Sequence, residues 1–305
     1  MQRSILIIIA LTLLSPTVWG QDADGAAADT TEVNPWEHGA SFSLTLSSIN
    51  LSNWAGGGQS ALSGNSEFIA FANYTTDQRS WTNRLQMAYG VLQEGGFGEA
   101  VKKNNDIFIF TSRYGQKINE NLKVSAGLDF RSQLAQGFAY AEDSLGIERA
   151  TLTSHILAPG YLITGLGVAY AKNNFTVDFA PVTGKFTFVL DEGLSAQGLY
   201  GVEPGQMARS EFGYSLALAY KKAFTDDFEY QVNGLFFSNY EGLNTVDVNI
   251  EFQARYRLNK WLTTNFSAQL IYDEDIDIAR NDGTVGPALQ YRSVTNIGFG
   301  FEFWK

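Results

Sequence analysis

Hydrophobic and polar residues alternate with a period of two along most of this chain. Residues 246–258 show the pattern most clearly. One face of that segment is apolar or aromatic: Val246, Val248, Ile250, Phe252, Ala254, Tyr256 and Leu258. The other face is polar or charged: Asp247, Asn249, Glu251, Gln253, Arg255 and Arg257. A period of two is typical of a β-strand, and a tilted run of this length can cross the hydrocarbon layer of a membrane. The segment therefore predicts a strand with one face toward lipid and the other toward a polar lumen.

About twelve strand candidates follow one another along the chain. They are residues 39–51, 65–75, 80–93, 105–118, 121–133, 160–172, 174–190, 210–224, 228–240, 244–259, 261–274 and 288–304. Short polar turns alternate with longer segments, and only the connection at Glu241–Leu243 is short where a long one is expected. Outer-membrane barrels sort their connections in this way, with the short turns in the periplasm and the longer loops outside the cell. The pattern predicts an all-β fold, a transmembrane antiparallel up-and-down β-barrel of about twelve strands.

The last strand candidate ends the chain on alternating aromatic residues. Ile297, Phe299, Phe301 and Phe303 share one face, and small or polar residues share the other. The spacing of Asn296, Gly298, Phe301 and Phe303 resembles the C-terminal β-signal that the outer-membrane assembly machinery recognises. We therefore expect that machinery to be a partner during insertion. Outer-membrane lipid and lipopolysaccharide are the expected surroundings of the folded barrel.

The first 37 residues predict export rather than barrel structure. A basic start, an apolar run over residues 4–14 and small residues at Val18 and Gly20 predict a signal peptide over residues 1–20, cleaved after Gly20. Residues 21–37 are rich in Ala, Asp and Thr without periodicity, which predicts a flexible acidic periplasmic leader. The barrel is then expected over residues 38–305. The chain has no cysteine, so neither a disulfide nor thiol chemistry is available.

The formal net charge of −11 argues against nucleic acid as a partner, because binding phosphates requires a basic surface.

Within strand 174–190, Pro181 cannot donate a ladder hydrogen bond, and we expect a β-bulge there. Aromatic residues such as Tyr74, Trp81 and Trp261 gather at the ends of strands beside the short turns, where an interfacial girdle is expected.

An ordered set of segments resembles one protein family. The matching stretches are Asn53–Gly57, Trp81–Gly90, Phe130–Gln133 with Gly137, Ala158–Tyr161, Pro181–Lys185, Phe237–Tyr240, Asn259–Leu262 and Ile271–Asp275. Together they resemble the domain of unknown function 3078 family of Bacteroidota outer-membrane proteins, over essentially the whole expected barrel. The resemblance implies an outer-membrane barrel and implies no activity.

Charged residues fall on the expected inner face of the strands. The candidate lumen-lining residues are Arg84, Arg113, Asp129, Arg131, Asp178, Glu211, Asp247, Glu251, Arg255 and Arg257. One hypothesis is a narrow channel for small polar solutes, whose selectivity these charges set. The alternative is a lumen plugged by a network of ion pairs, in a barrel that serves as a structural or accessory subunit of an outer-membrane assembly with an unidentified protein partner. Twelve strands lie between filled eight-stranded barrels and open porins, so the strand count leaves both open.

Two loops carry weaker candidates. Three consecutive glycines, Gly56, Gly57 and Gly58, follow Trp54, and this loop could fold into the barrel mouth as a gate or be an ordinary flexible loop. The acidic segment Asp273–Asp277 could bind Ca²⁺, but its spacing differs from that of an EF-hand, and a solvated acidic loop is the commoner explanation.

Catalytic and metal-binding patterns are poorly supported. The chain has two histidines, and His155 directly follows Ser154, so in a strand their side chains would diverge. Two separated histidines without cysteine do not supply the usual ligand set of a zinc site. We expect neither an enzyme nor a bound metal or cofactor, and an outer-membrane hydrolase is only a remote alternative.

Overall fold

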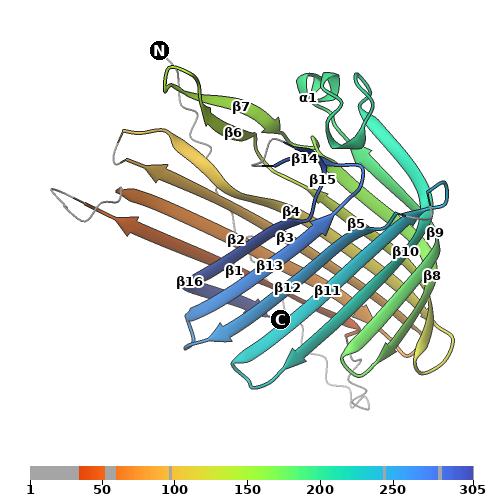
Figure 1. Ribbon diagram of the computed structural model, residues 1–305. Coiled ribbons are helices and arrows are strands. Elements are labelled where there is room, and N and C mark those ends of the chain that lie inside the picture. The colour runs from red at the N-terminus through yellow and green to blue at the C-terminus, as the bar shows by residue number, and fades with distance from the viewer. Residues whose placement is uncertain (1–33, 52–59, 96–97, 243–244, 281–283, 305) are drawn as a thin grey trace, which may run out of the picture. The chain divides into compact units, whose positions relative to one another are not determined.

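The computed structural model describes residues 34–51, 60–95, 98–242, 245–280 and 284–304. Twelve strands close into one antiparallel barrel (Figure 1). They are β1 (Trp36–Ile49), β2 (Ala61–Thr75), β3 (Arg79–Glu94), β4 (Val101–Lys117), β5 (Leu122–Ser132), β8 (Gly160–Lys172), β9 (Phe175–Phe188), β10 (Ala208–Ala223), β11 (Phe228–Asn239), β12 (Asp247–Arg257), β13 (Leu262–Tyr272) and β16 (Gln290–Trp304).

Each barrel strand pairs with its neighbour along the chain, and β16 closes the ring on β1. Backbone pairing runs from Gly39 opposite Trp304 to Leu44 opposite Phe299. The predicted fold class, an antiparallel transmembrane-type barrel of about twelve strands, is confirmed. The first strand begins at Trp36, three residues before the expected start, and the expected signal peptide and most of the leader lie outside the described residues. None of the helices in the described ranges is long and apolar enough to cross a membrane.

Side chains alternate between the outer and inner faces of the strands. On β8, the outward Leu166, Val168 and Tyr170 are 59%, 41% and 41% exposed, while the residues between them are partly covered. At the short-turn end, Trp36 packs against Tyr74 and Trp81, with ring centroids 5.2 and 5.9 Å apart. An apolar outer face ending in aromatic residues is the pattern of a lipid-facing barrel wall.

A bulge in β9 changes which residues face inward. Leu166 and Val168 of β8 lie opposite Val182 and Phe179, so two steps on β8 match three on β9. The same mismatch separates Gly213 and Ser215 on β10. The expected bulge at Pro181 is confirmed. Before the bulge, even-numbered residues such as Asp178 face the lumen, and after it, odd-numbered residues such as Lys185 do so.

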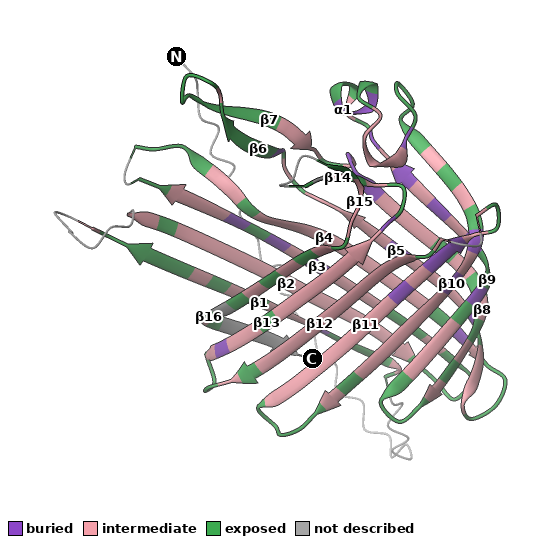
Figure 2. Cartoon of the chain, viewed as in Figure 1, coloured by how far each residue is buried: buried purple, intermediate pink, exposed green. Residues whose placement is uncertain are grey.

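Further elements lie in the connections at the long-loop end. They are the hairpin of β6 (Gly137–Glu142) and β7 (Glu148–Ser154), the helix α1 (Glu192–Ala196), the 3-10 turn η1 (Leu199–Gly201), and the hairpin of β14 (Asp277–Ala279) and β15 (Val285–Pro287). The sequence pattern predicted loops here. A small core of Ala158, Val189, Leu194 and Val202 holds α1 and η1. Buried positions accordingly gather toward the long-loop end of β9 and β11 and in the connections above them (Figure 2).

Candidate functional site

The strand register places all ten predicted lumen residues on the inner face of the barrel. Arg113 forms an ion pair with Asp129 on the adjacent strand. Ser125 donates a 2.7 Å hydrogen bond to Asp178. On β12, Arg255 Nε lies 3.4 Å from Glu229, and Arg257 lies opposite Thr263 on the same face. These placements concern position only, and a role in transport stays a prediction.

Direct contacts cross the lumen near its middle. Arg84 of β3 donates a 3.0 Å hydrogen bond to Gln253 of β12, although β13, β16, β1 and β2 separate these strands around the ring. Gln86 extends the chain of contacts, because its amide donates to Glu67 at 2.8 Å and accepts from Gln253 at 3.4 Å. We call Glu67, Arg84, Gln86 and Gln253 the central bridge. Side chains from nearly opposite walls therefore meet inside the barrel.

A second crossing contact lies nearby. Arg131 Nη1 of β5 is 3.0 Å from a carboxylate oxygen of Glu251 on β12, and β8, β9, β10 and β11 lie between these strands. The same Nη1 has no hydrogen bond of acceptable geometry. The contact is thus an ion pair without a well-aligned hydrogen bond. A pair of this kind leaves part of the guanidinium's donor capacity unused.

A buried lysine organises the long-loop end of the lumen. Lys185 Nζ lies 2.5 Å from Asp247, 2.9 Å from Asp273 and 3.6 Å from Glu211. Only 4% of its side chain is exposed, and its ammonium lies 5.7 Å from the ring centroid of Phe237. Three carboxylates from β10, β12 and the end of β13 converge on this one cation. We call these four charged residues the lysine cluster.

The lysine cluster continues into the long loops through Arg209. Its guanidinium contacts Asp275 at 2.9 Å, Glu211 at 3.2 Å and the carbonyl oxygen of Gly201 at 3.2 Å. Asp273 and Asp275, considered above as part of a Ca²⁺ site or a solvated loop, are therefore neutralised by protein cations. Among the described residues, no group of three or more acidic or histidine side chains is arranged to hold a metal ion.

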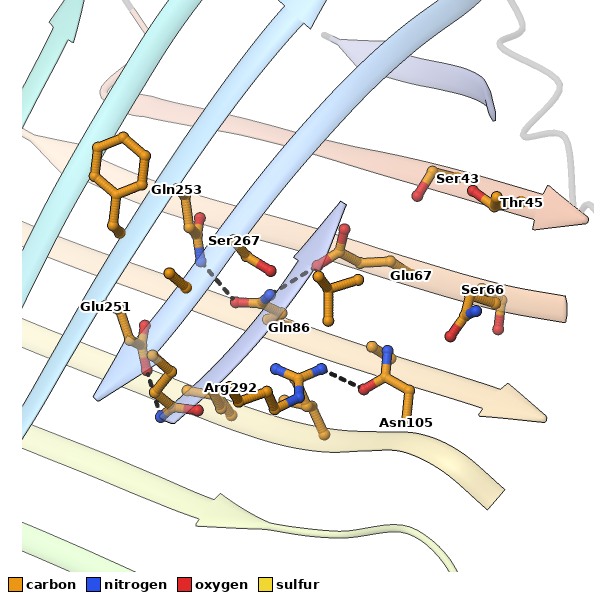
Figure 3. A pocket seen from close by; sticks show the side chains of 18 residues that line it. Ser43, Thr45, Ser66, Glu67, Gln86, Asn105, Glu251, Gln253, Ser267 and Arg292 are labelled. Carbon is orange, nitrogen blue, oxygen red and sulfur yellow. Dashed lines mark hydrogen bonds between the residues drawn. The ribbon is translucent and has the colours of Figure 1, made fainter. Parts of the chain in front are cut away.

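A polar cavity lies beside the central bridge. It contains about 570 Å³ of atom-free space, including its opening to solvent, of which about 30 Å³ is wide enough for the centre of a water molecule. Roughly two ordered waters fit that volume. Figure 3 shows Gln86 between Gln253 and Glu67, and Arg292 directed at Asn105. A second cavity of about 20 Å³ lies against Arg113, Asp129 and Asp178. The lumen is thus filled mostly by its own side chains.

Sequence reasoning missed several residues of this lumen. The lysine cluster depends on Lys185, whose inward direction follows from the bulge at Pro181. The inner face also includes Arg209, Arg292 and Glu67, whose positions follow the alternation of their strands. They were not predicted because they lie toward strand ends or in strands with a weaker alternation of apolar and polar residues. Counting every second residue afresh from the end of the bulge would have placed Lys185 on the inner face.

Other predicted site residues are described only in part. Trp54, Gly56, Gly57 and Gly58 lie outside the described residues. The proposed β-signal lies in β16, where Phe301 pairs with Phe42 and Phe303 with Ala40 through the backbone. His155 Nδ1 lies 3.6 Å from Asp191, the residue that caps α1. The expectation that the chain is not an enzyme stays a prediction.

Solved structures with detectable similarity include several outer-membrane proteins. An outer-membrane channel from Pseudomonas putida F1 is 11% identical, with a TM-score of 0.37, over 92% of this chain and 100% of that chain. The translocator domain of the autotransporter NalP from Neisseria meningitidis is 7% identical, with a TM-score of 0.39, over 90% of each chain. The P. putida toluene transporter TodX is 10% identical, with a TM-score of 0.30, over 88% and 89%. Similarity at this level carries no argument about function.

Two family models match different parts of the chain, and no curated protein matches it. Residues 160–285 match a protein family of unknown function, DUF481. Residues 46–138 match the protein family of unknown function DUF3078. The resemblance to the DUF3078 family that the sequence indicated is therefore confirmed over residues 46–138, whereas the matching stretches after residue 160 fall in the DUF481 model.

Proposed function

We propose that this protein is an outer-membrane barrel that works as a narrow channel for small polar solutes, with a constriction made of side chains. The location is supported by the outer surface, where large apolar residues such as Leu166 and Phe212 are more than half exposed. A closed barrel satisfies its backbone hydrogen bonds internally, which a lipid environment requires. The charged inner face disfavours lipid inside the lumen.

The observation that carries the proposal is the central bridge. The groups that cross the lumen are the ends of long side chains on β2, β3 and β12. Such side chains change rotamer on a picosecond to nanosecond scale when exposed, and more slowly when packed. Hydrogen bonds between them are replaceable by water or by a polar solute. The constriction can therefore yield to small solutes without moving the barrel wall.

Permeation through folded barrels in lipid vesicles tests this proposal. In an osmotic swelling assay, we expect vesicles that contain the protein to admit small polar solutes and to exclude trisaccharides. Empty vesicles, and vesicles with heat-unfolded protein, provide the controls. Swelling that is no faster than in empty vesicles, from barrels shown to be folded, would contradict the channel.

The same filled lumen supports a second candidate, a plugged barrel that serves as a structural or accessory subunit. The small size of both cavities favours it. This candidate predicts no permeation, together with co-extraction of a partner in constant proportion under mild detergent. A permeable barrel that extracts alone would exclude it.

A further inference from the structure

The cavity beside the central bridge contains charged groups of both signs without an ion-pair partner. Arg292 of β16 donates a 2.5 Å hydrogen bond to the amide oxygen of Asn105. Glu67 of β2 accepts a hydrogen bond from Gln86. Within the residues that the structure describes, neither has an opposite charge within 4.0 Å. Each therefore has only a neutral partner at short range.

These two charges face the same space. Both line the cavity, and Glu67 is the carboxylate with the strongest electrostatic effect on Arg292. A charge held away from bulk water is costly unless it is paired or hydrated. The two groups are close enough to influence each other but too far apart to form an ion pair. A ligand that carries an ammonium group and a carboxylate on the same carbon would complete the two pairs at once.

The rest of the cavity wall offers unused hydrogen-bonding groups. Ser43, Thr45, Asn65 and Ser267 line it, and in the described part of the chain their side chains have no hydrogen-bond partner. Ala88, Ile107 and Val294 add a small apolar area to the wall. The aromatic residue of the lining, Phe252, packs its ring against Tyr230 and Phe266. The lining therefore fits a compact polar molecule better than a sugar that stacks on an aromatic face.

We propose that this cavity binds a small zwitterionic solute of the α-amino acid class, with the carboxylate on Arg292 and the ammonium group on Glu67. The inference rests on the proposed channel function and names the class of solute. Binding moves the flexible ends of Gln86 and Arg292, because the cavity as it stands has room for only about two water molecules. Because Gln86 is part of the central bridge, occupancy of the cavity also loosens the contact that spans the lumen.

Binding of glycine, acetate and methylammonium to the folded, full-length mature barrel tests the proposal. Glycine carries both charges, and the other two probes carry one each. Titration by saturation-transfer NMR in detergent micelles measures all three without any need for transport. We expect glycine to bind at least about tenfold more tightly than acetate or methylammonium, because a charge-assisted hydrogen bond contributes that much or more.

Two variants test which protein residue binds each charged group of glycine. Arg292→Met should weaken glycine binding by about 10- to 100-fold and leave methylammonium binding unchanged. Glu67→Gln, which keeps the shape of the side chain, should reduce glycine to the affinity of acetate. Lys221→Met, an exposed lysine at the short-turn end, is the control and should bind glycine like the wild type. Heat-modifiable gel mobility shows that each variant is folded, and Glu67→Gln keeps the test decisive should Arg292→Met fail to fold.

The outcomes separate this inference from the channel function. Equal binding of the three probes to the wild type, or no effect of Glu67→Gln, would overturn the zwitterion site even if the barrel conducts. Selective glycine binding by a barrel that admits no solute would support the site and refute the channel.

Discussion

Removing the ammonium group of Lys185 should strongly destabilise the barrel. The Lys185→Met change keeps most of the side-chain volume but leaves Glu211, Asp247 and Asp273 facing one another. At an effective dielectric constant of about 20, one pair of charges about 2.9 Å apart attracts by roughly 6 kcal/mol, and desolvation offsets much of that. Loss of one partner from a buried pair typically costs about 3–5 kcal/mol. We expect a loss in this range, since Arg209 is then the one cation among the described residues that still contacts a carboxylate of the cluster.

The free energy of unfolding in lipid vesicles measures this effect. Urea titration, followed by tryptophan fluorescence and by heat-modifiable mobility, gives the midpoint for the wild type and the variant. Lys221→Met is the matched control, because the side chain of Lys221 is 62% exposed and its ion pair with Glu229 should contribute less than about 1 kcal/mol.

A double variant separates charge from packing. Lys185→Met combined with Asp247→Asn removes one of the opposing charges and should recover at least about 1 kcal/mol relative to Lys185→Met alone. If the Lys185→Met barrel is within about 1 kcal/mol of the wild type in stability, the three carboxylates are hydrated or already neutral, and the expected role of Lys185 is wrong.

Three further predictions concern the lipid face, the bulge and a surface loop. Leu166→Arg should destabilise the barrel by about 2–4 kcal/mol in vesicles, whereas Leu145→Arg, in the loop between β6 and β7, should change stability little; equal effects would contradict the membrane assignment. Gly167→Ala should cost about 1–3 kcal/mol, because its Cβ would lie 2.0 Å from the carbonyl oxygen of Phe179; an unchanged urea midpoint would show that the bulge can relax. The backbone N–H of Ile147 holds the pKa of Asp143 below its usual value, so protection of that amide from hydrogen exchange should be complete above about pH 4 and fall below it. Protection that does not change with pH, or that survives in Asp143→Ala, which removes the accepting oxygen, would contradict this.

The wall of the barrel was predictable because each strand repeats one simple physical constraint. On β12, apolar and polar residues alternate without interruption, so both faces could be assigned from the sequence. The alternation of short and long connections then fixed an up-and-down order. Within the acidic segment, Asp273 behaved differently, because it is buried on Lys185 rather than exposed to solvent. Glu274, Asp275 and Asp277 are exposed.

The contacts inside the lumen could not be predicted in the same way. Arg84 and Gln253 are 169 residues apart in sequence, and they meet only because the stagger of twelve strands brings them to the same height. Lys185 was missed because the extra residue at Pro181 reverses the inward and outward positions beyond it. The helix α1 was missed because five residues carry little periodicity, and contacts of Leu194 with Val189 and Val202 hold it in place.

Single-channel conductance in a planar bilayer, with the wild type compared with Arg84→Ala, measures whether side chains constrict an open lumen. We expect small discrete steps for the wild type and larger steps for Arg84→Ala, because that change removes the shorter of the two hydrogen bonds that join β3 to Gln253 of β12 across the lumen. Lys221→Met should conduct like the wild type. Silence from both the wild type and Arg84→Ala, in barrels shown to be folded, would contradict a side-chain constriction in a channel.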